Sequence, residues 1–344
     1  MAGIGSCRWS SLPSDLIHLI STKLPDLSDR ARMRAVCKTW HSSVSLLDPS
    51  PCLPWLVPWN MREKEEILCY SLSSRKTYKI HCPQLRGACL QGMAGRFVLC
   101  YRRGPSKSLS LFNPLTGIEI PLPCPEDGCT FAVVSNPLQE DVVAVAGYTP
   151  NADEIWVALI RRGDQTWGRH NLDINYQEGV CVYCDGFYYV NQYNQYEMPT
   201  QIVDATTGEV VTTVPPPDTG SYLIAYQNIL ETSGQILLIY RHETTGKLED
   251  IAFGIYRLDQ VRGHYQWAEV RSIGDRMLFL DNFVGFTLKS TDFPGYRGNC
   301  IYFQLQDDLE HRKPLLCWHD LENGTTKAMP NFCGKWGTWI IPNF

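Results

Sequence analysis

Hydrophobic positions follow two periods along this chain, one typical of helices and one typical of strands. In residues 11–44 the spacing is helical and predicts two short helices. The first carries a stripe of apolar residues three and four apart, formed by Leu16, Leu19, Ile20 and Leu24. The second carries a longer apolar arc, formed by Met33, Val36, Cys37, Trp40 and Val44. Beside that arc we expect a cationic ridge, because three basic residues recur every four positions: Arg30, Arg34 and Lys38.

Prolines indicate where this helical segment begins and ends. Pro13 suits an early helical position, and Pro25 after Leu24 ends the first helix; Ser28 is a suitable N-cap for the second. Residues 48–58, DPSPCLPWLVP, contain four prolines and indicate a boundary. Helices this short bury too little apolar surface to be stable alone, so they either pack on the rest of the chain or bind a partner.

Beyond this boundary, short strand-like runs alternate with turns. A strand, a polar tip with Gly, Asn or Ser, and a second strand recur in residues 67–83, 96–123, 200–217 and 314–330. The segment 96–123 reads as three strands. Between these segments lie apolar runs that predict inner strands, beginning at Gly87, Cys129, Gly179, Ser221 and Arg276. Their starts are roughly 40 to 55 residues apart, which is typical of four-stranded propeller blades.

This pattern predicts a mainly β fold with a small α N-terminal domain: a helical segment followed by a β-propeller. Six blades are favoured and seven are the alternative count. The inner segments give five blades, and a sixth combines residues 53–80 with the terminal strand WGTWIIP, residues 336–342, which would close the ring. The chain lacks the Gly-Gly doublet of kelch repeats and the WD-repeat signature. A two-sheet sandwich remains the alternative fold, because short strands with frequent turns also fit it.

Charge and composition restrict the function classes. The net charge of −5 argues against attraction to nucleic acid or to an anionic membrane surface. Apolar runs such as residues 236–240 are too short to cross a bilayer, and residues 1–10 show no secretory signal. We therefore expect the protein in the cytoplasm, the nucleus or both. In such a reducing compartment the 14 cysteines should be thiols, packed mostly as small apolar groups.

Candidate chemistry is sparse, and no cofactor, metal or catalytic residue is predicted. Cys181 and Cys184 have the spacing of zinc ligands, but residues three apart on a strand face opposite sides, so we expect core thiols. Four histidines are dispersed and are predicted to lie at the surface or in turns: His242, His264, His311 and His319. The aromatic stretch 183–196 is predicted to pack in the core, with a surface that binds protein or sugar as the alternative.

The helical segment SLPSDLIHLISTKLPDLSDRARMRAVCKTWHSSV resembles an F-box of the plant type. The matching elements, in order, are Leu12-Pro13, Asp15-Leu16, Ile20, Leu24-Pro25, Asp29-Arg30, Val36-Cys37-Lys38 and Trp40. Residues 265–288, residues 297–303 and the ending WIIP resemble the propeller-like domain of unknown function that commonly follows a plant F-box, of the KIB-type, F-box/kelch-like family. The resemblance implies an F-box helical domain at 8–48, a proline-rich boundary at 49–58, and a β-propeller at 53–344 closed by the C-terminal strand.

F-boxes bind a Skp-type adaptor, which connects them to a cullin. The resemblance therefore implies a non-catalytic substrate-recognition subunit of a Skp-cullin-F-box (SCF) ubiquitin ligase, whose propeller binds an unknown target protein. By position, the adaptor-facing surface would be formed or supported by Leu12, Pro13, Leu16, Ile20, Leu24, Val36, Cys37 and Trp40. The alternative is that some of these residues, Trp40 especially, hold the helices together instead.

Two other classes of function remain open at this point. A propeller enzyme, such as a glycosidase or an oxidase, would need clustered carboxylates or metal-binding histidines near the ring axis. An interaction protein would keep the same fold without binding the adaptor. The ligase interpretation requires that the helices keep an exposed apolar face, because helices whose apolar residues are all covered by the propeller would have no surface for an adaptor.

Overall fold

The fold comes from a computed structural model that describes residues 9–342, except for fifteen short internal segments and one at the domain boundary. The segments left out are 25–26, 45–51, 60–64, 95–96, 103–106, 125–129, 134–141, 150–153, 162–163, 173–178, 193–198, 220–223, 245–246, 282–284, 307–313 and 333–334. His311 and the last four residues of the aromatic stretch, 193–196, therefore lie outside the described residues. In the described part of that stretch Tyr183 and Tyr188 are buried, as the predicted core packing requires.

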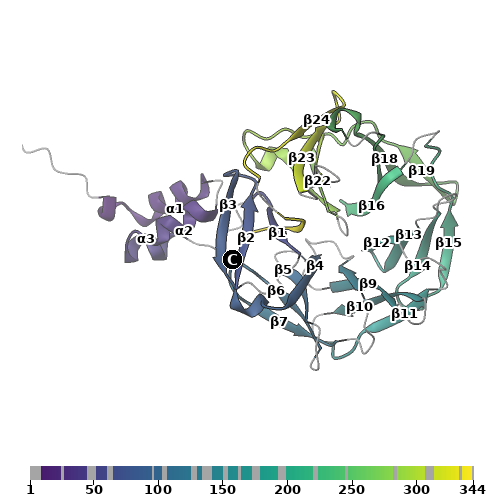
Figure 1. Ribbon diagram of the computed structural model, residues 1–344, viewed down its shortest axis with the longest axis horizontal. Helices are drawn as coiled ribbons and strands as arrows, with labels where there is room; N and C mark the ends of the chain where they lie inside the picture. The colour runs from purple at the N-terminus through teal and green to yellow at the C-terminus, as the bar shows by residue number, and fades with distance from the viewer. Residues whose placement is uncertain are drawn as a thin grey trace, which may run out of the picture.

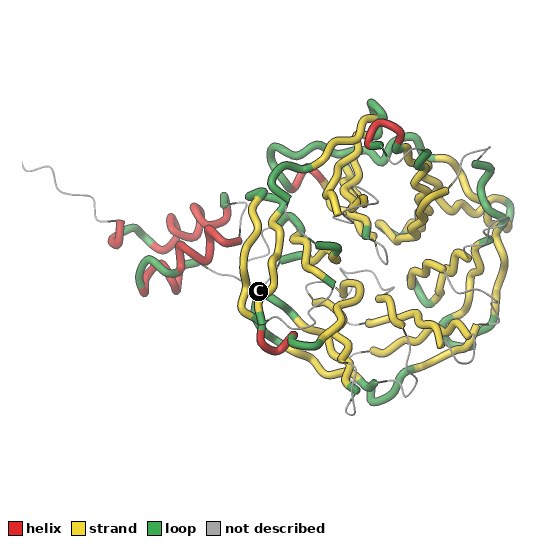
Figure 2. Tube along the Cα trace, in the orientation of Figure 1, coloured by secondary structure: helices red, strands yellow, loops and turns green. Residues whose placement is uncertain are grey.

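The described part of the N-terminus forms a helical head, residues 9–44, beside the ring (Figures 1 and 2). It contains the 3-10 turn η1 (Trp9–Ser11) and the helices α1 (Ser14–Thr22), α2 (Leu27–Arg34) and α3 (Lys38–Ser43). Pro13 occupies the N-cap position of α1, and its carbonyl accepts hydrogen bonds from the amides of Leu16 and Ile17 at 3.1 Å. Proline suits this place because the first helical turn has no use for its missing N–H.

The segment predicted to be the second helix forms two separate helices, α2 and α3. It breaks after Arg34, where the amides of Ala35 and Val36 bond three residues back, and Cys37 is extended at φ −164°. The predicted cationic ridge is therefore wrong. Arg30 is buried and donates two hydrogen bonds to the Leu24 carbonyl, at 3.1 and 3.2 Å. Arg34 donates to the Val44 carbonyl at 2.5 Å. The two carbonyls lie just beyond the C-terminal ends of α1 and α3, where the helix itself supplies no donor. The arginines therefore connect different parts of the head.

The β region is a propeller and not the alternative two-sheet sandwich (Figure 1). Four of its sheets are each formed by four consecutive strands. The first sheet contains β4 (Ala88–Ala94), β5 (Phe97–Arg102), β6 (Ser108–Phe112) and β7 (Glu119–Leu122). The second contains β8 (Thr130–Val133), β9 (Val142–Thr149), β10 (Glu154–Arg161) and β11 (Gly168–Leu172). The third sheet contains β12 (Gly179–Cys184), β13 (Phe187–Gln192), β14 (Thr200–Asp204) and β15 (Val210–Val214). The fourth contains β16 (Ile224–Thr232), β17 (Gln235–His242), β18 (Ala252–Val261) and β19 (His264–Glu269).

Two further sheets complete the ring and depart from this regular order. One has five strands, in the order β21 (Gly285–Lys289), β20 (Arg276–Leu280), β22 (Cys300–Gln306), β23 (Pro314–Asp320) and β24 (Thr325–Ala328). In it β22 runs parallel to β20, which the sequence did not predict. The other sheet has the order β25 (Gly337–Ile340), β1 (Trp55–Pro58), β2 (Glu66–Ser71) and β3 (Lys76–His81). The alternative count of seven has no counterpart in the described residues. The connections include the short 3-10 turns η2 (Pro83–Leu85), η3 (Leu248–Asp250) and η4 (Ser290–Asp292).

Strands from both ends of the propeller region meet in the last of these sheets. β25 pairs with β1 in antiparallel register, with Leu56 opposite Trp339 and Trp55 opposite Ile340. Trp339 is 1% exposed, and its indole N–H donates to the Leu280 carbonyl of the neighbouring sheet at 3.1 Å. The pairing closes the ring because it removes the free edge that β1 would otherwise present.

The predicted outer hairpins are present, and three of them share one turn chemistry. Asn113 Oδ1 accepts hydrogen bonds from the amides of Leu115 and Thr116, at 2.9 and 3.1 Å. Asp204 Oδ1 accepts the equivalent pair, from the amides of Thr206 and Thr207, and Asp320 Oδ1 accepts the first of these bonds, from the amide of Glu322. In each turn a glycine with positive φ follows four residues after the capping side chain: Gly117, Gly208 and Gly324. The local sequence thus determines these turns.

Apolar side chains fill the spaces between sheets, and the predicted core thiols are among them. Cys181 and Cys184 are both buried, in two different clusters on opposite faces of β12. The described residues contain no group of His, Cys, Asp or Glu that could hold a metal ion. No helix in the described segments is long and apolar enough to span a membrane.

The prediction of surface histidines is wrong for two of the four. His264 is exposed, but His242 and His319 are buried. His319 lies on β23, where Nδ1 is 2.8 Å from Thr326 Oγ1 and the ring is 5.0 Å from that of Phe253. Packing between sheets therefore covers a residue that the local sequence presents as polar. Burial lowers the pKa of His319 to about 4.

Candidate functional site: the helical head

The helical head has a small core of its own. Ile17 and Val44 are fully buried and Met33 nearly so. Three partly buried residues pack against this core: Leu12, Leu24 and Trp40. The indole N–H of Trp40 donates to the Trp9 carbonyl at 3.2 Å, which attaches η1 to α3. All members of this core belong to the head, so among the described residues its packing needs no propeller side chain.

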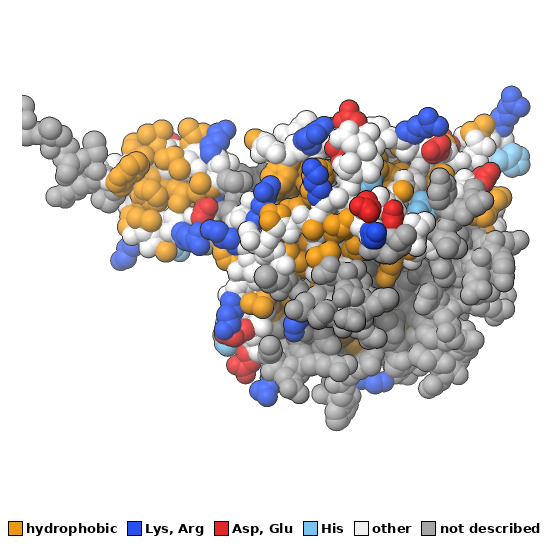
Figure 3. Space-filling model, turned by 45° about the horizontal axis from the view of Figure 1, so that its top comes forward, with side chains coloured by type: hydrophobic (Ala, Val, Ile, Leu, Met, Phe, Trp, Pro, Cys, Tyr) orange, Lys and Arg blue, Asp and Glu red, His pale blue; other side chains and the backbone are white. Residues whose placement is uncertain are grey.

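The apolar stripe of α1 points away from this core. Leu16, Leu19 and Ile20 are 48, 54 and 39% exposed, whereas Ile17 and Ser21 on the adjacent side of the helix are buried. We call these three residues the α1 face; their spacing of three and four places them together on the helix. Figure 3 shows hydrophobic side chains gathered on the head. A cluster of half-exposed aliphatic residues on so small a domain is typical of an interaction surface.

The structure divides the eight predicted adaptor-facing residues into two groups. Pro13, Leu16, Ile20 and Val36 are exposed, and Val36 is 58% exposed in the turn between α2 and α3. Leu12, Leu24, Cys37 and Trp40 are only partly exposed. Of these, Cys37 occupies the N-cap position of α3, and the others pack on the core of the head. They are placed to support the exposed group more than to contact a partner.

Two exposed residues were missed among the predicted site residues. Leu19 belongs to the predicted stripe, and its helical spacing from Leu16 was the signal that could have included it. Trp9 is 68% exposed and precedes the segment that resembles the F-box most closely. No sequence signal distinguishes it from other N-terminal residues.

The α1 face can contribute binding energy only through burial. Its side chains are aliphatic, and each has about half of its surface still in water. Complete burial of an aliphatic side chain of this size stabilises by about 1.5–3 kcal/mol, so covering the remaining half is worth about 1 kcal/mol per residue. The α1 face is therefore suited to a protein partner with a complementary apolar groove, and it offers no group for covalent chemistry.

The structure thus defines a protein of two parts, a helical head with an exposed apolar face and a propeller. The F-box domain model matches residues 9–49, which include the described head. The chain belongs to the KIB1-4 beta-propeller family, whose model matches residues 69–327. It is thus an F-box protein whose propeller is of the KIB1-4 type.

Individual relatives agree with this assignment. The chain is 24% identical to F-box protein At2g05970 of Arabidopsis thaliana, over 98% of this chain and 96% of that protein. It is 34% identical to F-box protein At3g56470 of the same plant, over 33% of this chain and 30% of that protein. Among solved structures, TolB from Acinetobacter baumannii superimposes with a TM-score of 0.52 at 10% identity, covering 89% of this chain and 71% of that one. This likeness concerns the fold alone.

Proposed function

We propose that this protein is the substrate-recognition subunit of an SCF ubiquitin ligase. The observation that carries the proposal is the α1 face: Leu16, Leu19 and Ile20 remain half exposed on a head whose own core is already formed. F-box domains generally bind Skp-type adaptors, and the F-box model covers this segment. A Skp-type adaptor would cover the α1 face and connect the protein to a cullin.

The mechanism is one of proximity. The head binds the adaptor while the propeller binds a target protein, and the complex holds a lysine of the target near a charged ubiquitin carrier. Holding two reactants in one assembly raises their effective concentration, so this chain needs no catalytic residue and no cofactor. We place this activity in the cytoplasm, the nucleus or both, where SCF ligases would meet soluble targets.

Direct contact with the adaptor is assigned to the exposed residues of the head. These are Pro13, Leu16, Leu19, Ile20 and Val36. Leu12, Leu24 and Trp40 act through the core of the head, which fixes the angle between α1 and α3. A substitution in this second group would reduce adaptor binding by loosening the head.

The test is a pull-down of purified Skp-type adaptor with the full chain and with Leu16→Ala/Leu19→Ala/Ile20→Ala. Each truncation removes part of an exposed side chain, so the head should keep its core and its fold. We expect the triple variant to bind the adaptor about 100-fold more weakly, because three contacts of about 1 kcal/mol each are lost.

His18→Ala/Lys23→Ala is the matched control, because both residues are exposed polar positions in α1 or directly after it. This variant should bind like the parent chain. Equal recovery of adaptor by the parent and the triple variant would refute the ligase assignment. The remaining class of function would then be an interaction protein that has this fold and does not bind the adaptor.

A further inference from the structure

The turn between β23 and β24 contains the single Asn-Gly pair of the chain, Asn323-Gly324. Asparagine is a chemically labile residue, and it is most reactive before glycine, because no side chain shields the amide nitrogen that follows. Both residues are exposed, and a Cβ on Gly324 would meet no described atom within 4 Å. β24 is the outermost strand of its sheet and lies at the rim of the ring (Figure 1). The pair is therefore accessible to water and to solvent base.

The reaction available to this pair is deamidation through a cyclic imide. The Gly324 amide nitrogen loses its proton to solvent base and attacks Asn323 Cγ. The new N–Cγ bond forms, the Cγ–Nδ2 bond breaks, and the side-chain amide takes up a proton and leaves as ammonia. Water then adds to either carbonyl of the ring and breaks its C–N bond. The product is aspartate or isoaspartate, with one new carboxylate, and water is the co-reactant.

In the folded turn, Asp320 holds both of the groups that must react. The Gly324 N–H donates to the Asp320 carbonyl at 2.9 Å, and Asn323 Nδ2 donates to Asp320 Oδ2, also at 2.9 Å. Asp320 itself is 6% exposed and pairs with Thr325 across the two strands, so it is fixed by the sheet. The attacking nitrogen keeps its proton in one hydrogen bond and the leaving amide is held in the other. Both bonds must break before the ring can close.

The charges around the turn also oppose this reaction. The attacking nitrogen becomes negative as it loses its proton, and the oxygen on Cγ becomes negative as the new bond forms. The carboxylate of Asp320 lies beside both atoms and repels this charge. Arg297 offsets the repulsion only in part, because its Nη1 is 3.8 Å from Asp320 Oδ2 while its Nη2 lies 3.1 Å from Glu322 Oε2.

The two equivalent turns of the propeller do not carry this chemistry. Thr116 and Thr207 stand directly before the glycine there. The hydroxyl of each accepts a hydrogen bond from the amide two residues ahead, at 3.2 Å. Threonine thus suits this position of the turn, and the turn geometry does not require Asn323.

We propose that Asn323 is a site of spontaneous deamidation that is protected in the native hairpin and reacts when β24 separates from β23. Asp320 is the residue that protects it. The reaction rate then follows the fraction of time for which the hairpin is open, as amide hydrogen exchange does. The product has a third carboxylate beside those of Asp320 and Glu322, and isoaspartate also lengthens the backbone, so a chain that has reacted does not re-form the same turn. The modification therefore records, irreversibly, that the outer strand has opened.

The test incubates the full chain under mildly alkaline conditions and measures by peptide mass spectrometry how much Asn323 has become aspartate or isoaspartate. The parent chain should react at least about tenfold faster in denaturant than in its native state. Asp320→Ala should react at least about fivefold faster than the native parent, because a hydrogen bond and the repelling charge are both lost. Asp320→Asn keeps the size of the side chain and removes its charge, and it should also react faster. Circular dichroism verifies that each variant is folded.

Asp204→Ala is the matched control. It makes the same truncation in an equivalent turn that has Thr207 before its glycine, so the rate at Asn323 should not change. Asn323→Thr copies the other turns and should give no product at this position.

Four outcomes would overturn the proposal. Equal rates in the native and the denatured parent would mean that the fold gives no protection, and no reaction in the denatured parent would mean that the pair is not reactive. Rates in Asp320→Ala and Asp320→Asn no faster than in the parent would remove Asp320 from the argument. An equal acceleration by Asp204→Ala would show that general destabilisation, and not the opening of this hairpin, controls the reaction. None of these measurements involves the adaptor, so they do not depend on the ligase assignment.

Discussion

Trp339 gives the most direct test of how the propeller closes. This residue lies on β25 and is 1% exposed, packed edge-to-face on Phe279 at 5.4 Å and hydrogen bonded to the Leu280 carbonyl. Trp339→Ala removes the whole ring from the seam between two sheets. Substitution of a core Trp by Ala costs about 3–5 kcal/mol, and leaving a buried carbonyl without its donor adds about 1 kcal/mol. We therefore expect a loss of about 4–6 kcal/mol in the free energy of unfolding.

Denaturant unfolding at equilibrium, followed by circular dichroism, measures this loss. A typical protein has only about 5–15 kcal/mol of stability, so the variant should unfold at much lower denaturant concentration or fail to fold at 37 °C. Trp336→Ala is the matched control. Trp336 is half-buried and stacks on Trp59 at 6.0 Å, so its truncation should cost about 1–2 kcal/mol. If the two variants lose equal stability, the seam at Trp339 does not hold the ring closed.

Three further predictions concern single residues. Burial keeps the pKa of His319 at about 4, below its ordinary value of 6.5, so protons bind the unfolded chain first as the pH falls. Lowering the pH from 6.5 to 4 should therefore cost the parent chain about 3 kcal/mol of unfolding free energy, measured by denaturation at each pH, and His319→Gln should not show this loss. Ile17→Ala should cost about 3 kcal/mol within the head and abolish the hydrogen-exchange protection of α1, while the amides of the propeller remain protected; a simultaneous loss in both parts would contradict the separate core of the head. Gly208→Ala should cost about 2 kcal/mol in thermal unfolding, because φ is +76° and the new Cβ would lie 2.6 Å from His170 Nδ1, whereas Gly168→Ala, which meets only a contact at 3.7 Å, should cost less.

The hairpins could be predicted from sequence because their chemistry is local. Asn113, Asp204 and Asp320 each accept amide hydrogen bonds from residues two positions ahead, and a glycine supplies the positive φ that follows. The pattern therefore places both the turn and the strands that flank it. The parallel pairing of β22 with β20 could not be predicted in this way, because it depends on how the chain returns over residues 290–299.

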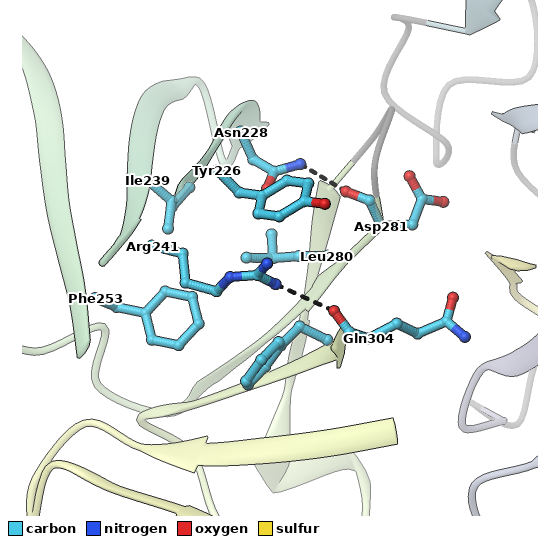
Figure 4. A pocket seen from close by; sticks show the side chains of 9 residues that line it. Tyr226, Asn228, Ile239, Arg241, Phe253, Leu280, Asp281 and Gln304 are labelled. Atoms are coloured by element: carbon cyan, nitrogen blue, oxygen red, sulfur yellow. Dashed lines mark hydrogen bonds between the residues drawn. The ribbon is translucent and has the colours of Figure 1, made fainter. Parts of the chain in front are cut away.

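The head shows the limit of hydrophobic periodicity. The spacing of Leu16, Leu19 and Ile20 predicts an apolar face, but it does not say whether that face is buried. In the structure Ile17 supplies the buried contact, and the stripe is left in water. The break after Arg34 was missed because no Pro or Gly marks it. A small pocket between two sheets, lined in part by Tyr226, Arg241 and Gln304 (Figure 4), could not be predicted either, because these residues come from three strands that meet only in the folded ring.

The position of β1 has a mechanical consequence. The chain leaves the head and enters the propeller at β1, which pairs with β25 along one edge and with β2 along the other. Tension applied through the head therefore pulls along a strand that is held on both sides, and the hydrogen bonds of both ladders must break together in shear. A strand at the edge of a sheet could instead peel away one bond at a time. The attachment is thus built to bear load if the head and a bound target are drawn apart.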